Sequence, residues 1–186
     1  MNRYIAFLRA INVGGHTVRM EELRAHFETL GLVNVETFIA SGNIIFETDQ
    51  EDIRALEGQI ENHLQETLGF PVATFLRSDH ELSEIAHYQA FAPAQLDSAQ
   101  ALNVAFLAAP LSEESQGILL TFTSDIDKFH HHGREVYWLC RKKQSESNFS
   151  NAVFERALKL KSTIRGLNTI IKLTAKYPPD GRRSQP

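Results

Sequence analysis

The segment from Leu8 to Gly15 holds the residues best suited to binding a ligand. Arg9 and Asn12 are polar, and Gly14 and Gly15 are adjacent, at the crossing from an apolar strand to a helix. Glycine lacks a Cβ, so its backbone N–H groups can approach a ligand, and a helix N-terminus carries partial positive charge. Arginine adds a forked cation that matches phosphate or carboxylate. We therefore expect an anion site here; the alternative is that the glycines only form a tight loop.

A second polar segment, Ser41-Gly42-Asn43, falls between two predicted strands. Ser41 and Asn43 are further candidate ligand-binding residues. The same composition is typical of a hairpin turn, and turn formation alone explains the segment. In the predicted element order, this turn and Arg9 need not be neighbours.

A third candidate surface is a helix predicted over residues 163–176. Its residues Arg165, Asn168, Thr169 and Lys172 are spaced so that they share one helical face. Such a face can donate hydrogen bonds to phosphate or bind an acidic strand. The alternative is the solvated face of a basic helix.

Other reactive residue types give weaker patterns. His16 is the one candidate acid–base group for an enzyme, but no carboxylate accompanies it at a fixed spacing. His130 and His132 point the same way on a predicted strand without a visible third ligand, so we expect no metal site. The single cysteine, Cys140, excludes an intrachain disulfide and is expected to be buried. No phosphate-binding or dinucleotide motif occurs, and no cofactor is predicted.

The elements that position these residues follow from the spacing of apolar residues. Acidic residues open the first predicted helix, and Gly69 with a following proline closes the second. The first half is predicted as strand, helix, strand, strand, helix and strand, over residues 4–11, 20–30, 35–39, 44–46, 53–64 and 72–76. This is the ferredoxin-like βαββαβ order.

The second half repeats this order, which predicts an internal duplication. Its predicted strands and helices cover residues 103–109, 112–120, 126–130, 135–140 and 152–160. No closing strand is evident, and the helix over 163–176 stands in its place. In this duplication Gly42–Phe46 aligns with Gly133–Tyr137.

The predicted fold class is therefore α+β, with two ferredoxin-like subdomains in tandem, the second degenerate, and an additional C-terminal helix. The expected divisions are a first subdomain over 1–78, a connecting helix and linker over 79–101, and a second subdomain over 102–177. Residues 178–186 are rich in proline, glycine and arginine, and we expect a disordered tail there.

Composition constrains the class of protein. The chain of 186 residues is 42% hydrophobic, which is ordinary for a globular protein. It shows no signal peptide or membrane span, so a cytoplasmic protein is expected. The net charge of −4 is unevenly distributed: residues 1–140 hold 8 Lys or Arg and 20 Asp or Glu, and residues 141–186 hold 11 and 3. The basic segment suits a nucleic-acid or anion surface, or docks on the acidic remainder.

Three motifs together resemble the DUF1697 family of bacterial proteins of unknown function. They are residues 8–15 (Leu-Arg-Ala-Ile-Asn-Val-Gly-Gly), residues 41–46 (Ser-Gly-Asn-Ile-Ile-Phe) and residues 163–173 (Thr-Ile-Arg-Gly-Leu-Asn-Thr-Ile-Ile-Lys-Leu). The third departs from the family pattern, because Gly166 and Leu167 stand where relatives have Asn and Trp. The resemblance spans residues 3–177 and implies two similar ferredoxin-like subdomains. It implies no activity and no cofactor.

Two hypotheses follow for function. The first is a binding module for a phosphorylated small molecule or nucleic acid, which uses the Gly-Gly loop, Arg9, Asn12 and the basic C-terminal face. The second is an enzyme of unassigned reaction that positions an anionic substrate at the same loop. The sequence of this protein favours the binding module. It does not identify the ligand, the oligomeric state, or whether the two subdomains share one cleft.

Overall fold

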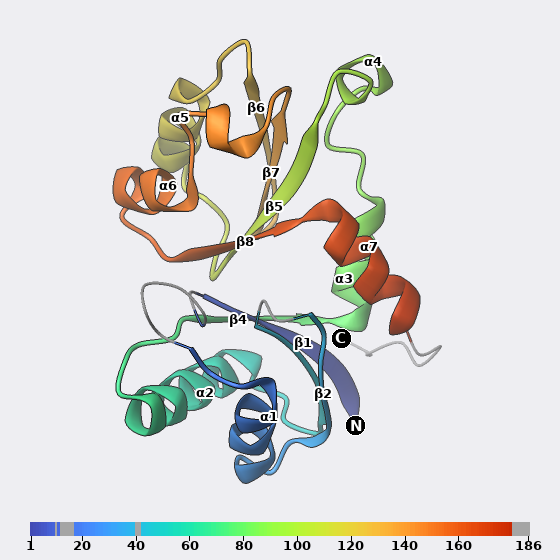
Figure 1. Cartoon of the computed structure of the whole chain (residues 1–186), viewed down its shortest axis with the longest axis vertical. Coiled ribbons are helices and arrows are strands. Elements are labelled where there is room, and N and C mark those ends of the chain that lie inside the picture. The colour runs from blue at the N-terminus through green and yellow to red at the C-terminus, as the bar shows by residue number, and fades with distance from the viewer. Residues whose placement is uncertain (10, 12–16, 40–41, 180–186) are drawn as a thin grey trace. The chain divides into compact units, whose positions relative to one another are not determined.

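The structure is a computed structural model that describes residues 1–9, 11, 17–39 and 42–179. The chain divides into two compact units, Met1–Ser83 with Leu173–Pro186, and Glu84–Lys172. The described residues form two four-stranded antiparallel sheets and seven α-helices (Figure 1). The expectation of an α+β chain is confirmed.

The first sheet is built around an apolar central strand. Ile5 to Leu8 of this strand are buried, and the strand pairs on both sides. The strand order is β2-β3-β1-β4. The bounds are β1 (Asn2–Leu8), β2 (Val33–Thr37), β3 (Asn43–Thr48) and β4 (Thr74–Ser78). The first strand thus ends three residues before the predicted Ile11.

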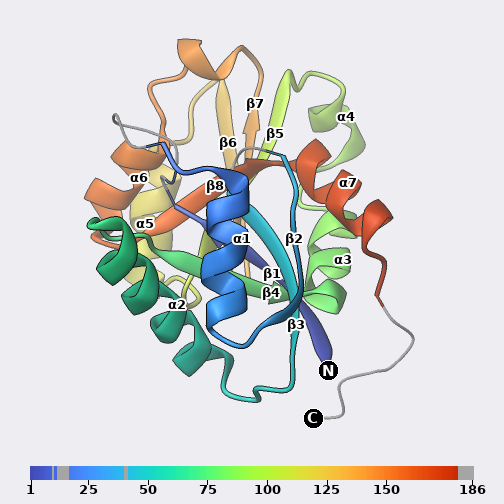
Figure 2. The same cartoon turned by 60° about the horizontal axis from the view of Figure 1, so that its bottom comes forward.

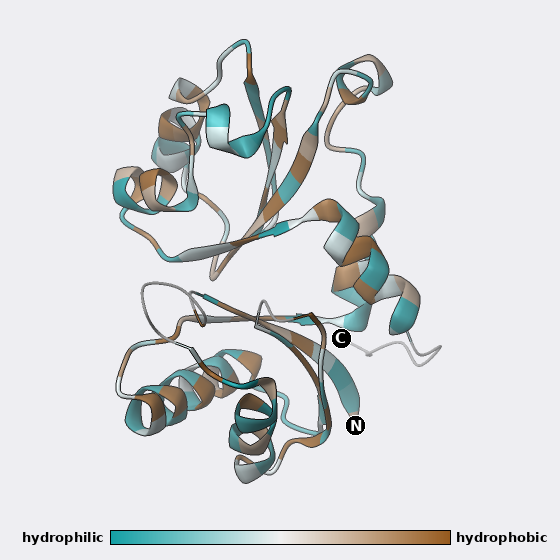
Figure 3. Cartoon of the chain, viewed as in Figure 1, coloured by the Kyte–Doolittle hydropathy of each residue, from teal (hydrophilic) through white to brown (hydrophobic). Residues whose placement is uncertain are grey.

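Two amphipathic helices, α1 (Met20–Thr29) and α2 (Ile53–Leu68), cover one face of this sheet (Figure 2). Asp52 caps the start of α2 by accepting a hydrogen bond from Ala55 N, and Gly69 ends it in the left-handed conformation. Apolar segments, brown in Figure 3, run along the strands beneath these helices. The core includes Ala6, Leu8, Leu23, Phe27, Ile44, Phe46, Leu56, Ile60 and Leu64.

Two glutamates of α2 cover the open edge of β4. Leu76 N donates to Glu57 Oε1 at 2.8 Å, and Thr74 N donates to Glu61 Oε1 at 2.7 Å. An edge strand otherwise presents unpaired N–H groups that can pair with another chain. The carboxylates therefore complete the hydrogen bonding of this strand and protect it.

The second sheet has the order β6-β7-β5-β8, which is equivalent to that of the first. Its strands are β5 (Ala101–Leu107), β6 (Asp127–His132), β7 (Glu135–Cys140) and β8 (Ser162–Gly166). The helices α5 (Glu113–Thr121) and α6 (Asn151–Leu158) accompany it, with a short 3₁₀ helix, η1 (Gln144–Glu146). The core includes Leu107, Leu119, Val136, Trp138, Phe149 and Phe154.

The prediction of a single helix over residues 163–176 was wrong. Ser162–Gly166 forms β8, and α7 (Leu167–Lys176) begins only after it. The β-branched Thr163 and Ile164 favour a strand, and β5 offers a complete ladder of partners for it. This strand also corrects the prediction of a degenerate second half, because the closing strand is present.

The edge of β8 is covered in the same way as that of β4. Ser162 N donates to Glu155 Oε1 of α6 at 2.8 Å, and Ser162 O accepts a hydrogen bond from Asn151 Nδ2. Both sheets thus use a glutamate of the preceding helix to close the last strand. This shared device supports an internal duplication independently of strand order.

The sheet registers give the correct alignment of the two halves. Phe7 pairs with Asn43, and Phe106 pairs with Glu135, so Asn43 corresponds to Glu135. The predicted alignment of Gly42 with Gly133 was therefore wrong by one residue. Side chains alternate between the faces of a strand, and the corrected register places Phe46 and Trp138 in equivalent core positions.

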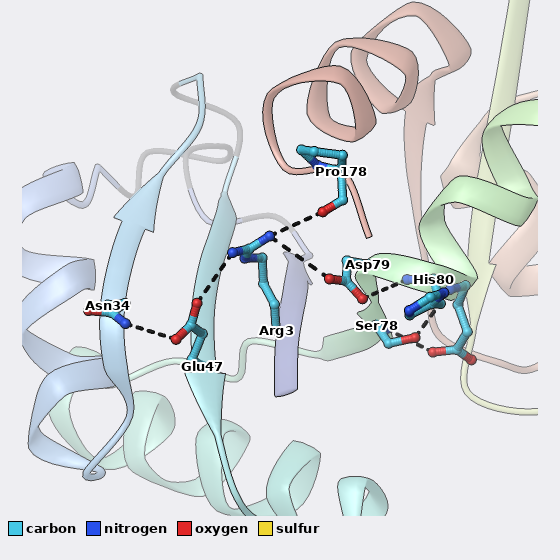
Figure 4. Close-up of polar contacts among 8 residues, drawn as sticks. Arg3, Asn34, Glu47, Ser78, Asp79, His80 and Pro178 are labelled. Carbon is cyan, nitrogen blue, oxygen red and sulfur yellow. Dashed lines mark hydrogen bonds and ion pairs between the residues drawn. The ribbon is translucent and has the colours of Figure 1, made fainter. Parts of the chain in front are cut away.

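The C-terminal end of α7 and the residues after it belong to the first unit. Tyr177 Oη donates to Glu36 Oε2 at 2.6 Å, and Lys176 Nζ pairs with the same oxygen at 3.2 Å. Arg3 Nη1 donates to Pro178 O at 3.2 Å, and its guanidinium also faces Glu47 and Asp79 (Figure 4). Of the basic C-terminal residues, Lys176 thus pairs with an acidic residue of the first sheet.

Two further helices, α3 (Asp79–His87) and α4 (Pro93–Leu96), follow the first sheet. A capping box opens α3: Glu81 N donates to Ser78 Oγ, and Ser78 N donates to Glu81 Oε2. Within residues 1–9, 11, 17–39 and 42–179, no helix has the length and apolar character needed to cross a membrane.

Candidate functional site

The first two sequence motifs meet at one end of the first sheet. Because β1 and β3 are antiparallel, the end of β1 lies beside the start of β3. Leu8 N donates to Gly42 O at 2.8 Å, and Arg9 N donates to Ala73 O at 2.8 Å. The expectation that the turn and Arg9 need not be neighbours was too cautious, because strand pairing alone brings them together.

Gly42 is required by this close approach. Its φ is +70°, a region that side chains rarely adopt, and a Cβ there would lie 2.8 Å from Ile11 Cγ2 and 3.1 Å from Leu8 Cβ. Gly42 therefore allows both the left-handed conformation of the turn and the close contact with Leu8 and Ile11. These contacts make Leu8, Arg9, Ile11, Gly42 and Asn43 one structural feature, which we call the loop edge.

Asn43 contributes to the loop edge from within. Its side chain is fully buried and donates from Nδ2 to Phe38 O at 3.0 Å, while Phe38 N donates to Asn43 O at 2.9 Å. These bonds hold the two ends of the turn together. Arg9, which follows Leu8 in the chain, is half-buried.

Ile39 follows Phe38, which is hydrogen-bonded to Asn43 of the loop edge, and its conformation was not predicted from the sequence. Its φ is +57° although it is β-branched, and its side chain is 55% exposed. A β-branched residue in this region is strained, and such strain is concentrated at functional sites. No local sequence pattern signals this conformation, since an isoleucine after a strand is ordinary.

Several predicted site residues lie outside the described part of the chain. They are Asn12, Gly14, Gly15 and Ser41, and His16 lies there too. Arg9 and Asn43 are therefore the predicted residues of the first two motifs that the structure describes.

The third motif does not form the single polar face that was predicted. Arg165 is on β8, and its Nη1 donates to Thr163 Oγ1 at 2.8 Å and Ile164 O at 2.9 Å. Burial lowers the pKa of Arg165 to about 10. Asn168 and Lys172 are exposed on α7, and Thr169 is half-buried there. Residues 165–172 belong to the second unit, whereas Arg9 and Asn43 belong to the first.

Arg77 is the counterpart of Arg165 and was missed by sequence reasoning. Arg77 pairs with Ile5 and Arg165 with Val104, which are equivalent positions of the two sheets. Arg77 is 1% exposed, and its Nη1 donates to Leu76 O at 2.7 Å, as Arg165 Nη1 does to Ile164 O. The repeated pattern of an aliphatic residue followed by Arg was a usable signal, but the predicted helix concealed it.

The histidines of β6 contact an aromatic residue. Tyr88 Oη lies 2.9 Å from His130 Nε2, and the Tyr88 ring stacks on His132 at 4.1 Å. Burial, with the charges of His131 and His132, lowers the pKa of His130. Among the described residues, no group of three or more His, Cys, Asp or Glu could hold a metal ion.

Cys140 is fully buried at the end of β7. Burial raises the pKa of its thiol, so the reactive thiolate is disfavoured. The prediction of a buried strand residue is confirmed.

Basic residues of the second unit gather at the end of α6. Arg156, Lys159 and Lys161 line a cavity of about 460 Å³, together with Glu155. These basic residues belong to the second unit, whereas the loop edge belongs to the first. They are part of the basic segment, residues 141–186, that the sequence analysis identified.

The fold and the loop edge define a class of α+β proteins with two sheets of equivalent strand order. The chain belongs to the DUF1697 family, described as proteins of unknown function, whose model matches residues 1–137. The first two motifs lie inside this match, and residues 163–173 lie beyond it.

A solved structure has a similar fold. It is described as "conserved bacterial protein SP0830 from Streptococcus pneumoniae", with 24% identity and a TM-score of 0.71. The similarity covers 95% of this chain and 98% of that chain. A comparison with curated proteins gave no match.

Proposed function

We propose that this protein binds a phosphorylated small molecule at the loop edge of its first unit. The observation that carries the proposal is the contact between the two motifs, in which Leu8 N donates to Gly42 O beside Arg9. A strained, exposed Ile39 in the same turn adds to it. Pairing of β1 with β3 accounts for the convergence of the two motifs, but turn formation does not require the strain at Ile39.

Arg9 supplies the chemistry in this proposal. A guanidinium presents a planar fork of donors that matches two oxygens of a phosphate, and it stays charged at all physiological pH values. Asn12, Gly14, Gly15 and Ser41 are proposed to complete the site with backbone and side-chain donors. Asn43 is proposed to hold the turn in place beside them.

Asn168 and Lys172, the exposed polar residues of the third motif, are proposed as a separate anion-binding surface of the second unit. Nucleic acid is the ligand that would engage this surface and the basic residues of α6. We further propose that each unit is a ferredoxin-like module, since each has the βαββαβ order and equivalent strand pairing.

A thermal-shift titration tests the proposed site. Inorganic phosphate and ribose 5-phosphate are added at low salt to the parent protein and to Arg9→Ala. A ligand at 100 times its dissociation constant raises stability by about 2.7 kcal/mol. We expect this stabilisation in the parent and its loss in Arg9→Ala.

Arg24→Ala is the matched control, because Arg24 is an exposed α1 residue paired with Glu28 at 3.3 Å. It should keep the ligand response. A short RNA is the third ligand in this titration. Stabilisation by RNA alone that falls steeply as salt is added would replace the small-molecule proposal by nucleic-acid binding. No response to any of the three contradicts both.

A further inference from the structure

We infer that the second unit contains a binding site for a small, uncharged aromatic molecule that carries a hydrogen-bond acceptor. The site is a cavity of about 200 Å³ between α3, α4, the strand pair β5 and β7, and the start of α7. Its apolar walls include Tyr88, Phe91, Leu102, Tyr137 and Leu167. This site lies in a different unit from the loop edge and goes beyond the function proposed there.

A buried donor without a partner lines the cavity. Asn103 is 4% exposed, and its Oδ1 accepts a hydrogen bond from Gln144 Nε2 at 2.5 Å. Its Nδ2 is buried and has no hydrogen-bond partner among the described residues. A buried amide left unsatisfied is unfavourable, so the position suits a ligand that brings an acceptor.

The aromatic walls are held in place before any ligand arrives. Tyr137 Oη donates to Ile85 O at 3.2 Å, and the ring of Tyr88 packs on Tyr137 with centroids 5.2 Å apart. His130 and His132 also contact Tyr88 and hold it in place. A site whose walls are already ordered loses little entropy on binding.

The lining sets the chemical class of the ligand. Its eleven residues include no Lys, Arg, Asp or Glu, and its one histidine, His87, offers no counter-charge when the imidazole is neutral, so a charged ligand would lose its hydration without compensation. Flat aromatic walls favour a planar ring. A cavity of about 150 Å³ holds benzene, so this one has room for a ring with a small substituent. An aromatic amide combines the ring with a carbonyl acceptor for Asn103.

Benzamide is the probe that tests this inference. The ¹H–¹⁵N spectrum of the full chain is recorded as benzamide is added up to about 10 mM, a range that detects millimolar binding. We expect shifts of the Asn103 side-chain amide and of the Tyr88 and Tyr137 backbone amides. Benzoate has the same shape but a negative charge, and toluene lacks the acceptor. We expect no binding of benzoate, and toluene binding about fivefold weaker than benzamide.

Two variants separate the site from general effects. Asn103→Leu should weaken benzamide binding about five- to tenfold, because it removes one hydrogen bond. Leu167→Trp should abolish binding by filling the cavity, whereas Leu120→Trp, the same change at a 59% exposed residue outside the lining, should not. Absence of these shifts, equal binding of benzoate, or full affinity in either cavity variant would overturn the inference.

Discussion

At the scale of single residues, the loop edge depends on one glycine and one arginine with separate roles. Gly42 allows the backbone of the turn to lie against Leu8 and Ile11, while Arg9 supplies the charge. Substitution of Gly42 should therefore affect folding first, and substitution of Arg9 should affect binding first. This separation makes the structural and functional parts of the motif testable one at a time.

Gly42→Ala is expected to destabilise the protein by about 2–4 kcal/mol, from the left-handed conformation and the 2.8 Å approach to Ile11. Chemical denaturation measures this loss. Gly31→Ala is the matched control, because Gly31 also has a positive φ, of 77°, but its added Cβ would meet nothing within 4 Å. It should cost only about 1–2 kcal/mol. Equal losses in the two variants would show that the contact with Ile11 is unimportant.

The half-buried pair His26 and His63 should make stability depend on pH. Their rings lie 5.2 Å apart, and burial, with the charge of His63, lowers the pKa of His26 below its ordinary value near 6.5. The unfolded chain then binds a proton that the native state does not. The free energy of unfolding is thus highest above the ordinary pKa and falls as the pH drops from about 7 through the lowered pKa.

Urea denaturation at a series of pH values measures this dependence. In His26→Gln the fall in stability on acidification should be smaller than in the parent protein. Some fall should remain, because the pKa of His130 is lowered in the same direction. An identical pH profile for the variant and the parent would exclude His26 as its source.

At the scale of elements, the last strand of each sheet is completed by side chains of a helix. Removal of one such carboxylate should leave a buried N–H group without its partner. Glu57→Ala is expected to cost about 1–3 kcal/mol, because Leu76 N loses its acceptor. The exposed Glu66 on the same helix provides the control, and Glu66→Ala should change stability by less than about 0.5 kcal/mol.

Within the first unit, the residues that follow α7 should be held by Tyr177. Tyr177→Phe removes the hydrogen bond to Glu36 and is expected to cost about 1 kcal/mol, since Tyr177 is buried but Glu36 is about half exposed. In a Glu36→Gln background the cost should shrink. A double-mutant cycle measures this coupling. Additive losses in the cycle would mean that the two residues act independently.

Glu36 should also contribute a dependence on pH. The hydrogen bond from Tyr177 and the charge of Lys176 lower the pKa of Glu36. Its contribution to stability is therefore present above the ordinary pKa of a glutamate and is lost as the pH falls through the lowered one.

At the scale of the whole molecule, hydrophobic spacing predicted the first unit well. Apolar periodicity and the glycine and proline signals placed α1, α2 and the strands of the first sheet within a few residues. The closing strand β8 was missed because its sequence, Ser-Thr-Ile-Arg-Gly, shows no clear alternation of apolar and polar residues. Its partner on β5 decides its conformation, and pairing between distant segments is not visible in a local pattern.

The candidate site was predictable in its residue types but not in its geometry. Arg9 and the glycines stood out because their chemistry is unusual for a strand exit. Their contact with Gly42 depends on the pairing of β1 with β3, and the cavity at Asn103 depends on five separate elements. The strain at Ile39 and the burial of Arg77 likewise arise only when the sheets form.

The central claim is that phosphate-bearing ligands bind at the loop edge. The most direct measurement is a ¹H–¹⁵N titration of the full chain with ribose 5-phosphate, with the shifts assigned to residues. We predict that the amides of Leu8, Arg9, Gly42 and Asn43 shift together and that Arg9→Ala removes these shifts while the spectrum stays folded. Shifts confined to residues 165–172, or unchanged shifts in folded Arg9→Ala, would contradict the account.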